Sequence, residues 1–473
     1  ETESTQLNGA TVQRMSALTA SAGVKLTYKR PMGGLAHVLY LPQAMTVNEA
    51  KAIAAKIAAA NPNVEYAEPD YVRRALFVPN DPGYAGGFTF TAGGGQHGRQ
   101  AQWDMMAPTD SYSYLPIGAS VQTSMAPVGG ANLPAAWDIT KGSGAVIGVV
   151  DTGLTSHPDL NANMVGGSPA SSGYDFISVN VPSVTSTNVN FTANDGDGRD
   201  ADPSDPGDWT AVGDCGTNEP ATAENSSWHG THVSGTIAAV GNNNVGVAGI
   251  AYQAKVLMAR ALGKCGGTST DISDAIRWAA GGSVPGVPAN SNPAKVVSMS
   301  LGGSTLSAPD ICSNTEQLAV NAARAAGAVV VAATGNDGTM NIASPSSCAG
   351  VIAVTAHTIE GDNADYANIG DSGDGTSTTA ATNSTTISAP GGGCGTSITA
   401  STTPACADQY VWSTSNTGTQ GPATAAYAGA AGTSMATPHV AGVAGLLFSL
   451  NPSLLPDTVA SLLTSTARPF PAG

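Results

Sequence analysis

The sequence predicts an α/β fold: a doubly wound, mostly parallel sheet with helices on both faces, preceded by a small α+β domain. Three observations support this prediction. Short unbroken apolar runs recur after about residue 130, helical segments stand between several of them, and a Pro/Gly-rich segment separates this region from residues 1–76. Strands buried on both faces read as continuous apolar runs, and their alternation with helices is typical of a covered parallel sheet.

The front section, residues 1–76, reads as a separate small domain. Residues 24–30 and 36–42 have strand-like composition. Residues 46–60 are expected to form a helix, because Thr46 and Glu49 fit a capping box and the following apolar side chains share one face. The segment RRALFVPNDPGYAGGF then breaks into turn residues, so the second predicted domain is 77–473.

The second domain is predicted from five apolar runs and four helical segments. The runs are 145–150, 255–262, 295–301, 328–334 and 350–356. The helical segments are 270–280, 315–327, 432–450 and 455–467. In such a sheet, functional residues gather at the carboxyl ends of the strands.

The charge and the cysteines are unevenly distributed along the chain. Residues 1–76 hold 8 Lys/Arg and 6 Asp/Glu, whereas the rest holds 10 and 28, and all six cysteines lie beyond residue 200. A strongly acidic body argues against nucleic acid as a partner and favours cations. The even cysteine count favours disulfides and an oxidising compartment.

No apolar run reaches the roughly 18–20 residues that a membrane span needs. The chain begins ETESTQ, without Met or a signal peptide. We therefore expect a secreted, extracellular protein without a membrane partner, whose signal peptide has been removed or is not part of the given sequence.

The stretch SSWHGTHVSG contains His229 and His232, which share one helix face and so could clamp a metal. Alternatively, one of them is a catalytic base. The HExxH pattern of metalloproteases is absent, because no Glu follows His229. Asp151 ends a buried run and Ser434 begins a helix, so the chain also supplies the acid and the nucleophile that a histidine base serves. This combination favours catalysis.

The segments VIGVVDTGL, HGTH and GTSMATPHVAG, in that order, closely resemble the motifs of the subtilase family of serine proteases. The resemblance runs from about residue 77 to the end. It implies a subtilisin-like fold and a secreted, thermitase-like serine endopeptidase acting as a monomer on proteins and peptides. It assigns Asp151 as the orienting acid, His229 as the general base and Ser434 as the nucleophile, and leaves His232 structural. Asn336 in AATGNDG matches the oxyanion-hole asparagine.

The resemblance also implies how a substrate binds. Ser300, Leu301 and Gly302 match the strand that pairs with an extended peptide, and the opposite edge of the cleft matches Gly266 and Gly267. The primary pocket is expected to be lined by Ala333, Thr334 and Gly335. Their small side chains imply broad specificity with a preference for a large apolar residue at P1. Asp337 either favours basic residues there or is an exposed loop acid.

Two calcium sites are expected. The first is implied by VGNNNVGV, whose length matches the calcium loop of a thermitase-like subtilase. Its implied ligands are Asp81, Asp159, the Asn243 side chain and the carbonyls of Val240, Val245 and Val247.

The second calcium site is predicted in NDGDGRDADPSDPGD, residues 194–208. Six unpaired carboxylates in one glycine-rich loop would repel one another, so a cation is favoured over a solvated loop. The spacing is not that of an EF-hand. The candidate ligands are Asp195, Asp197, Asp200, Asp202 and Asp205.

Sequence proximity favours the disulfides Cys215–Cys265, Cys312–Cys348 and Cys394–Cys406, with free buried thiols as the alternative. The front domain resembles the ferredoxin-like propeptide of subtilases, which implies an intramolecular chaperone and inhibitor. Self-cleavage is then expected between Leu76 and Phe77. Residues 88–127 are longer than the entry segment usual in the family, and their role is not predicted.

Two other classes of function compete with the peptidase. A non-catalytic relative could keep the fold to bind proteins or calcium, but the intact set Asp151, His229, Asn336 and Ser434 argues against it. A sedolisin, the acidic-protease cousin, would need acidic residues where His229 and Asn336 stand.

Overall fold

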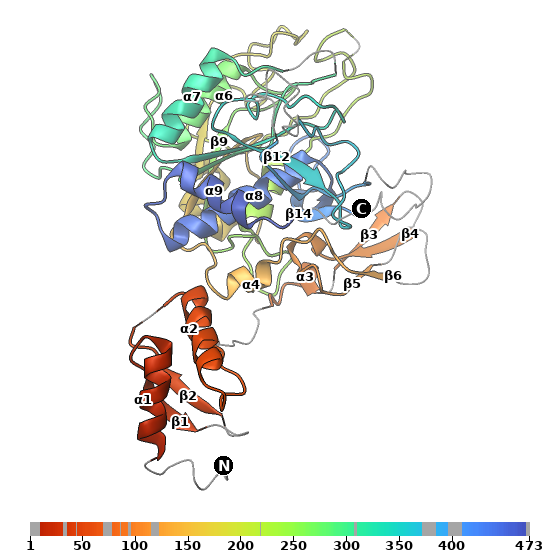
Figure 1. Cartoon of the computed structure of the whole chain (residues 1–473). Helices are drawn as coiled ribbons and strands as arrows, with labels where there is room; N and C mark the ends of the chain where they lie inside the picture. The colour runs from red at the N-terminus through yellow and green to blue at the C-terminus, as the bar shows by residue number, and fades with distance from the viewer. Residues whose placement is uncertain are drawn as a thin grey trace. The chain divides into compact units, whose positions relative to one another are not determined.

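The computed structural model describes residues 10–31, 36–43, 45–69, 78–85, 87–92, 96–114, 123–217, 219–306, 310–370, 385–395 and 409–469. They fall into two compact units, one within Glu1–Ala75 and the other within Leu76–Gly473 (Figure 1). Each unit has its own hydrophobic core. The expected cleavage point, Leu76 and Phe77, lies outside the described residues.

In its described part, the smaller unit consists of two helices and one antiparallel strand pair. These are α1 (Ala10–Ala22), β1 (Thr27–Pro31), β2 (His37–Tyr40) and α2 (Val47–Ala60). The capping box predicted for α2 is present, because the Thr46 hydroxyl accepts from the Glu49 backbone N–H while the Glu49 carboxylate accepts from that of Thr46. Leu26 and Ile57 are buried between the helices and strands.

The larger unit is built on a seven-stranded parallel sheet, which confirms the predicted fold class. Its strands are β7 (Val146–Asp151), β8 (Gly173–Asp175), β9 (Lys255–Arg260), β10 (Val296–Met299), β11 (Val329–Ala333), β12 (Ile352–His357) and β13 (Ile387–Pro390). The strand order is β13-β12-β11-β10-β7-β9-β8, and every neighbouring pair is parallel. β7 lies near the centre of the sheet. β8 and β9 lie on one side of it, and β10 to β13 follow in order on the other side.

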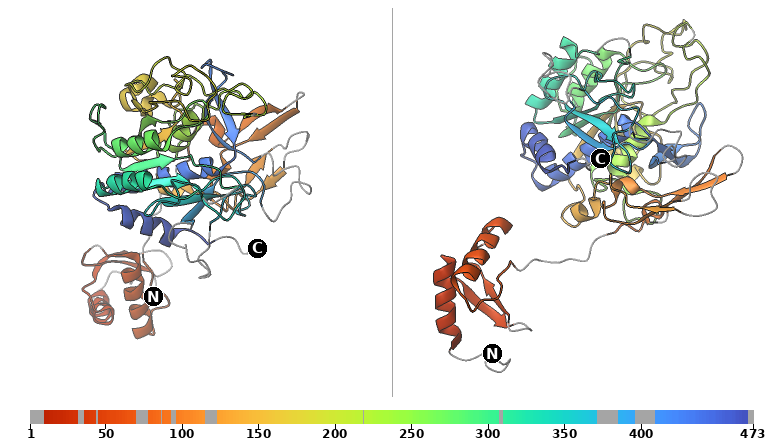
Figure 2. Two further views of the ribbon diagram at one scale, coloured as in Figure 1. Left: turned by 90° about the horizontal axis from the view of Figure 1, so that it is seen from above. Right: turned by 45° about the vertical axis from the view of Figure 1, so that its right-hand side comes forward.

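Helices cover both faces of this sheet. One face packs against α5 (His229–Ala238), α8 (Thr433–Leu450) and α9 (Pro456–Thr466). The other packs against α6 (Ser269–Ala279) and α7 (Asn314–Ala325), which lie side by side in Figures 1 and 2. Successive strand residues alternate between the two cores, Val149 facing the first and Val150 the second.

Short elements complete the larger unit. They are the helices α3 (Pro82–Ala85) and α4 (Leu133–Trp137), and the antiparallel pairs β3 (Phe88–Ala92) with β4 (Gln96–Gln100), β5 (Tyr112–Tyr114) with β6 (Thr123–Met125), and β14 (Val411–Asn416) with β15 (Ala425–Ala430). No helix in the described part of the chain combines the length and apolar character that crossing a membrane requires.

Candidate active site

The structure places Asp151 and His229 in direct contact, although they are far apart in the sequence. Asp151 is the last residue of the buried strand β7, and His229 is the first residue of α5. His229 Nδ1 lies 2.8 Å from Asp151 Oδ1 and 3.0 Å from Oδ2. The carboxylate also accepts from the Thr152 backbone N–H at 2.8 Å. Its side chain is fully buried, whereas that of His229 is 24% exposed, so the outer edge of the imidazole is accessible.

Two glycines allow this contact. A Cβ on Gly230 would lie 2.3 Å from the carbonyl oxygen of Gly153, closer than any side chain can approach. Gly153 itself has φ +110°, a conformation that L side chains rarely adopt. The glycines of the DTG and HGTH motifs therefore let the start of α5 approach the turn that follows Asp151.

Charge around His229 favours its protonated form. Burial alone lowers the pKa of His229, but the Asp151 carboxylate, with smaller contributions from Asp208 and Asp205, outweighs burial and raises the pKa above its usual 6.5. A base with this environment is ready to accept a proton from a neighbouring hydroxyl.

Ser434 is held by a reciprocal pair of hydrogen bonds with Ser300, the residue after β10. The Ser300 hydroxyl donates to the Ser434 carbonyl at 2.8 Å, and Ser434 Oγ donates to the Ser300 carbonyl at 3.2 Å. Pro438 lies four residues further along α8 and has no N–H, so the helix itself cannot satisfy the Ser434 carbonyl. Ser300 supplies the missing donor. Proton transfer to His229 requires the Ser434 side chain to turn away from the Ser300 carbonyl.

Asn336 and the start of α8 form a preorganised donor pair. The Asn336 Oδ1 accepts from the backbone N–H of Thr433 at 2.8 Å and from its hydroxyl at 2.9 Å. A Cβ added to Gly432 would lie 3.6 Å from both Asn336 Nδ2 and the Ser434 backbone N and 3.7 Å from Met435 Sδ, so these two nitrogens lie near one small space. Such a space suits an oxyanion.

His232 is structural rather than a partner of His229 in metal binding. It is buried, and its Nε2 donates to the Ala428 carbonyl at 3.1 Å. Burial, with the proximity of His229, lowers the pKa of His232 to about 4, so it is neutral where most proteins work.

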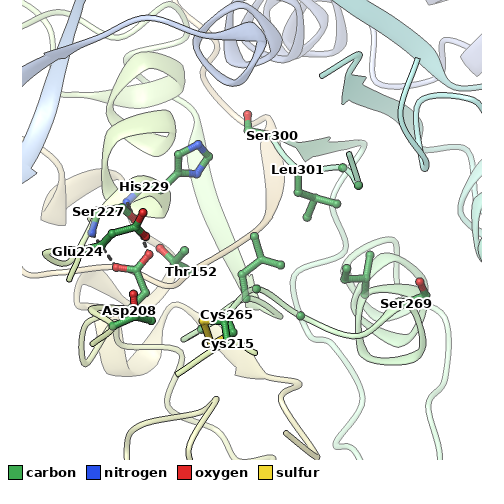
Figure 3. Close-up of a pocket in the computed structure, with 18 of the residues that line it drawn as sticks. Thr152, Asp208, Cys215, Glu224, Ser227, His229, Cys265, Ser269, Ser300 and Leu301 are labelled. Atoms are coloured by element: carbon green, nitrogen blue, oxygen red, sulfur yellow. Dashed lines mark hydrogen bonds between the residues drawn. A yellow bond between two sulfur atoms is a disulfide. The ribbon is translucent and has the colours of Figure 1, made fainter. Parts of the chain in front are cut away.

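A cavity of about 670 Å³ opens beside His229. Its lining contains both predicted substrate-binding segments, Gly266–Gly267 and Ser300–Gly302. In Figure 3, Asp208, Glu224 and Ser227 lie on the His229 side, while Leu301 and Ser269 lie across the cavity. The arrangement is a cleft in which an extended chain can reach His229.

The sequence analysis missed several groups in the walls of this cleft. The Cys215–Cys265 disulfide lies between its two sides (Figure 3). Five acidic residues also line it: Asp208, Glu219, Glu224, Asp310 and Glu316. The position of Cys265 directly before Gly266 was the only sequence signal for the disulfide's place in the cleft wall.

The predicted primary-pocket residues lie at the end of β11. Ala333 and Thr334 are buried, and the Thr334 hydroxyl donates to the Asn368 carbonyl at 2.6 Å, so it points into the protein. Gly335 has φ +108° and turns the chain toward Asn336. The Asp337 carboxylate accepts from the backbone N–H and hydroxyl of Thr305 at 2.6 and 2.9 Å, which explains this acid without a role in specificity.

The implied ligands of the first calcium site come together from three distant segments. Asp81 accepts from the backbone N–H groups of Asn242 and Asn243, at 2.7 and 3.2 Å. Asp159 accepts from Asn243 Nδ2 at 2.7 Å and from the Val247 backbone N–H at 2.9 Å. Both carboxylates are fully buried. Burial, opposed by these hydrogen bonds, raises the pKa of both, that of Asp159 to about 7, and Asp81 adds to the effect on Asp159.

A divalent cation fits this environment chemically. Two neighbouring buried carboxylates repel each other, and calcium prefers several oxygen ligands that include carboxylates. Val240, whose carbonyl was an implied ligand, is tied to the same cluster because its N–H donates to the Asp159 carbonyl at 2.7 Å. The Val245 N–H bonds the Asn243 Oδ1 at 2.8 Å.

The acidic loop differs from its prediction, because its carboxylates are not all without partners. Asp195 lies 2.6 Å from Arg260 Nη1, and Arg260 also pairs with Asp175. Asp205 is buried and bonded to Thr152 at 2.8 Å. The mutual repulsion on which the second calcium site was predicted is therefore smaller than the composition suggested. Exposed or partly exposed carboxylates remain on Asp197, Asp200 and Asp202.

Within the described part of the chain, no group of three or more His, Cys, Asp or Glu side chains is arranged to hold a metal. The first calcium site is compatible with this finding, because its ligands are two carboxylates, an amide and backbone carbonyls. A second calcium stays a prediction.

The structure contains the Cys215–Cys265 and Cys312–Cys348 disulfides. Cys394 is also disulfide-bonded. Its expected partner, Cys406, lies outside the described residues.

Comparison with known proteins agrees with this site. The chain is 43% identical over 415 residues to an extracellular protease of Xanthomonas campestris pv. campestris, covering 87% of this chain and 57% of that protein. It is 36% identical over 469 residues to an extracellular basic protease of Dichelobacter nodosus, covering 98% and 64%. It is 35% identical over 322 residues to thermitase of Thermoactinomyces vulgaris, covering 67% and 79%. The chain thus spans under two thirds of the length of the first two relatives.

Among solved structures, a protease from Pseudoalteromonas arctica is 48% identical and superposes with a TM-score of 0.62, over 73% of this chain and 89% of that one. The sequence model described as the subtilase family matches residues 142–472, which include Asp151, His229, Asn336 and Ser434. Because this match covers well over half of the chain, the protein belongs to the subtilase family.

Proposed function

We propose that this chain is a secreted serine endopeptidase, stabilised by calcium and made as a self-processed zymogen. Two pairs of groups carry the proposal: Asp151 and His229 at 2.8 Å, and the Asn336 amide and Ser434 backbone N, each 3.6 Å from the point that a Cβ on Gly432 would occupy. A binding protein that merely kept the fold would not need this arrangement.

In the proposed mechanism, Ser434 Oγ attacks the carbonyl carbon of the scissile bond while His229 Nε2 takes its proton. Asp151 accepts from His229 Nδ1–H and stabilises the imidazolium. The oxyanion is held by the Asn336 amide and the Ser434 N–H. His229 then protonates the leaving amine, and afterwards activates the water that hydrolyses the acyl-enzyme.

The cleft supports binding of an extended peptide with broad sequence tolerance. The edges at Gly266–Gly267 and Ser300–Gly302 offer main-chain groups to a substrate lying between them. We propose that large apolar side chains are preferred at P1, next to Ala333, Thr334 and Gly335.

Separate features support secretion of the protein and its binding of calcium. Two relatives are named extracellular proteases, and disulfides persist in oxidising environments. Calcium would neutralise the buried carboxylates of its site and so join the entry segment, the segment after β7 and the loop after α5. The groups that would hold it are Asp81, Asp159, Asn243 and the carbonyls of Val240, Val245 and Val247.

The smaller unit is proposed to be a propeptide that chaperones folding and inhibits the enzyme. Its fold and its own core support a separately folding module. Cleavage between Leu76 and Phe77 would break its covalent link to the larger unit. Its excess of basic residues over acidic ones would still attract it to the acidic larger unit.

One experiment tests the activity and the processing together. Wild type and Ser434→Ala are purified in calcium, and their intact masses and hydrolysis of casein are compared. We expect the wild type to split near residue 76 and to digest casein, and the variant to stay whole and inactive. If the wild type stays whole and cannot digest casein, a non-catalytic binding role is favoured. An activity optimum near pH 4 would instead favour sedolisin-like chemistry.

A further inference from the structure

The acidic loop is hydrogen-bonded to the turn that follows the catalytic acid. The Asp205 backbone N–H donates to the Leu154 carbonyl at 2.9 Å, and the Leu154 N–H donates to the Pro203 carbonyl at 3.2 Å. Residues 203–205 therefore lie against residues 152–154, the first residues after Asp151. The composition of this loop had suggested a metal site and gave no sign of this contact with the turn after Asp151.

The Asp205 side chain links this turn to the helix of the catalytic base. It is 3% exposed, and its Oδ2 accepts from the Thr152 hydroxyl at 2.8 Å. The Thr152 hydroxyl in turn accepts from the Gly230 N–H at 3.0 Å. A hydroxyl has one proton, so donating it to Asp205 leaves the Thr152 oxygen free to accept from Gly230. The chain Gly230–Thr152–Asp205 thus joins the residues that directly follow His229 and Asp151.

Asp208 makes a second link, at the entrance to α5. Its two carboxylate oxygens accept from the Ser227 N–H at 2.7 Å and the Ser227 hydroxyl at 2.6 Å. The Ser227 hydroxyl accepts from the His229 N–H at 3.3 Å. Figure 3 shows Asp208 and Ser227 directly beside His229. The backbone on both sides of the imidazole is therefore held by a carboxylate of this one loop.

We propose that Asp205 and Asp208 are positioning residues of the catalytic pair, which act through Thr152 and Ser227 to hold His229 against Asp151. The inference rests on the proposed peptidase function and deepens it. Neither carboxylate contacts the reacting atoms. Their role is to fix the geometry in which the proton moves, where small displacements of a base reduce turnover more than substrate binding.

Asp208 also contributes charge around His229, whereas burial raises the pKa of Asp205 to about 7, so that Asp205 is only partly ionised at neutral pH. Burial lowers the pKa of His229, whereas Asp151 and then Asp208 and Asp205 raise it, with a net increase. The remaining titratable neighbour on α5, His232, is neutral, because its pKa is lowered to about 4 mainly by burial. Removing the Asp208 charge is therefore expected to move the acid limb of the rate profile toward lower pH.

The test uses the full chain in calcium, with kcat and KM for a fluorogenic peptide measured from pH 5 to 9. The Thr152→Val variant removes the shared hydroxyl and Asp205→Ala removes its acceptor. Both should lower kcat about tenfold, the equivalent of one hydrogen bond of about 1.4 kcal/mol, while KM changes less than about twofold. Thr152→Ser keeps the hydroxyl and should recover most of kcat. If Asp205→Ala fails to fold, the Val and Ser variants of Thr152 still decide the question.

Asp208→Asn is compared with Asp214→Asn, which also removes one negative charge, from a turn where the Asp214 carboxylate accepts from the Ala211 N–H and lies near Lys264. Only the Asp208 variant should shift the acid limb. The inference is overturned if Thr152→Ser loses as much kcat as Thr152→Val. It is also overturned if the Asp205 and Asp208 variants both give the wild-type dependence of rate on pH. If the wild type hydrolyses the peptide no faster than Ser434→Ala does, the proposed function itself is refuted.

Discussion

Arg260 offers a quantitative test of how the larger unit holds its catalytic turn. Its side chain is 1% exposed, pairs with the fully buried Asp175 and with Asp195, and donates from Nε to the Thr152 carbonyl at 3.1 Å. Replacing Arg260 by Met would leave the Asp175 carboxylate buried without its cation. Removing one partner of such a pair costs about 3–5 kcal/mol where the remaining charge is uncompensated. Burial raises the pKa of Asp175 to about 8, so the comparison is made at pH 9, where this carboxylate is charged.

The expected change in melting temperature follows from the size of the unit. Leu76–Gly473 is about 400 residues, so at about 2.1 cal/mol/K per residue its unfolding entropy is about 0.8 kcal/mol/K. A loss of about 4 kcal/mol then lowers Tm by about 5 °C. The assay is calorimetry in calcium, with Ser434→Ala in every protein to prevent self-digestion.

The double variant Arg260→Met/Asp175→Asn separates this cause from lost packing. Asn at 175 carries no charge and can still accept from the Ile177 N–H, which bonds the Asp175 carboxylate at 2.8 Å. We expect it to recover at least half of the lost Tm. A Tm within about 1 °C of the parent for Arg260→Met, or a double variant no better than the single, would refute the reasoning.

Three further predictions concern calcium, the nucleophile and acid. EDTA should lower Tm, and Asp159→Asn should abolish the difference between calcium and EDTA; equal Tm values for the parent with and without EDTA would contradict this. Ser300→Ala should cost about 1–3 kcal/mol in urea unfolding, because the Ser434 carbonyl loses its donor, and Pro438→Ala added to it should restore part by supplying an N–H; no loss, or no restoration, would oppose this explanation. Burial lowers the pKa of His357 to about 4, so the unfolded chain binds more protons between pH 6.5 and 4. The unfolding free energy should therefore fall by up to about 3 kcal/mol as pH drops through this window, and His357→Gln should lack that part of the dependence, whereas an unchanged slope would count against it.

The central strands could be predicted from the sequence because their apolar runs are unbroken. β9, β10 and β11 fall within their predicted runs, and β7 and β12 extend one residue beyond theirs, at Asp151 and His357. The edge strands β8 and β13, with the sequences GYD and ISAP, were missed because three or four residues of mixed polarity carry no periodic signal. Helix α1 was also missed, although Ala is its commonest residue.

The residues of the candidate site could be predicted from the sequence only where they belong to a motif. Asp151, His229, Asn336 and Ser434 were named from their motifs; the structure pairs Asp151 with His229 and places the Asn336 amide near the Ser434 backbone N. The link between Thr152 and Asp205 depends on how a loop some fifty residues further along the chain folds back, which no local pattern specifies. Arg260 did give a signal, because a cation at the end of a buried apolar run needs an anion. Asp195 was instead interpreted as a metal ligand.

The most direct test of the central claim is the intact mass of the protein after treatment with a sulfonyl fluoride, which reacts with an activated serine. The account predicts one sulfonyl group, located on Ser434 by peptide mapping, with none on Ser434→Ala and a much slower reaction for His229→Ala. Two results would contradict it. One is a treated wild type that has the mass of the untreated protein and still hydrolyses casein. The other is a sulfonyl adduct on Ser434→Ala.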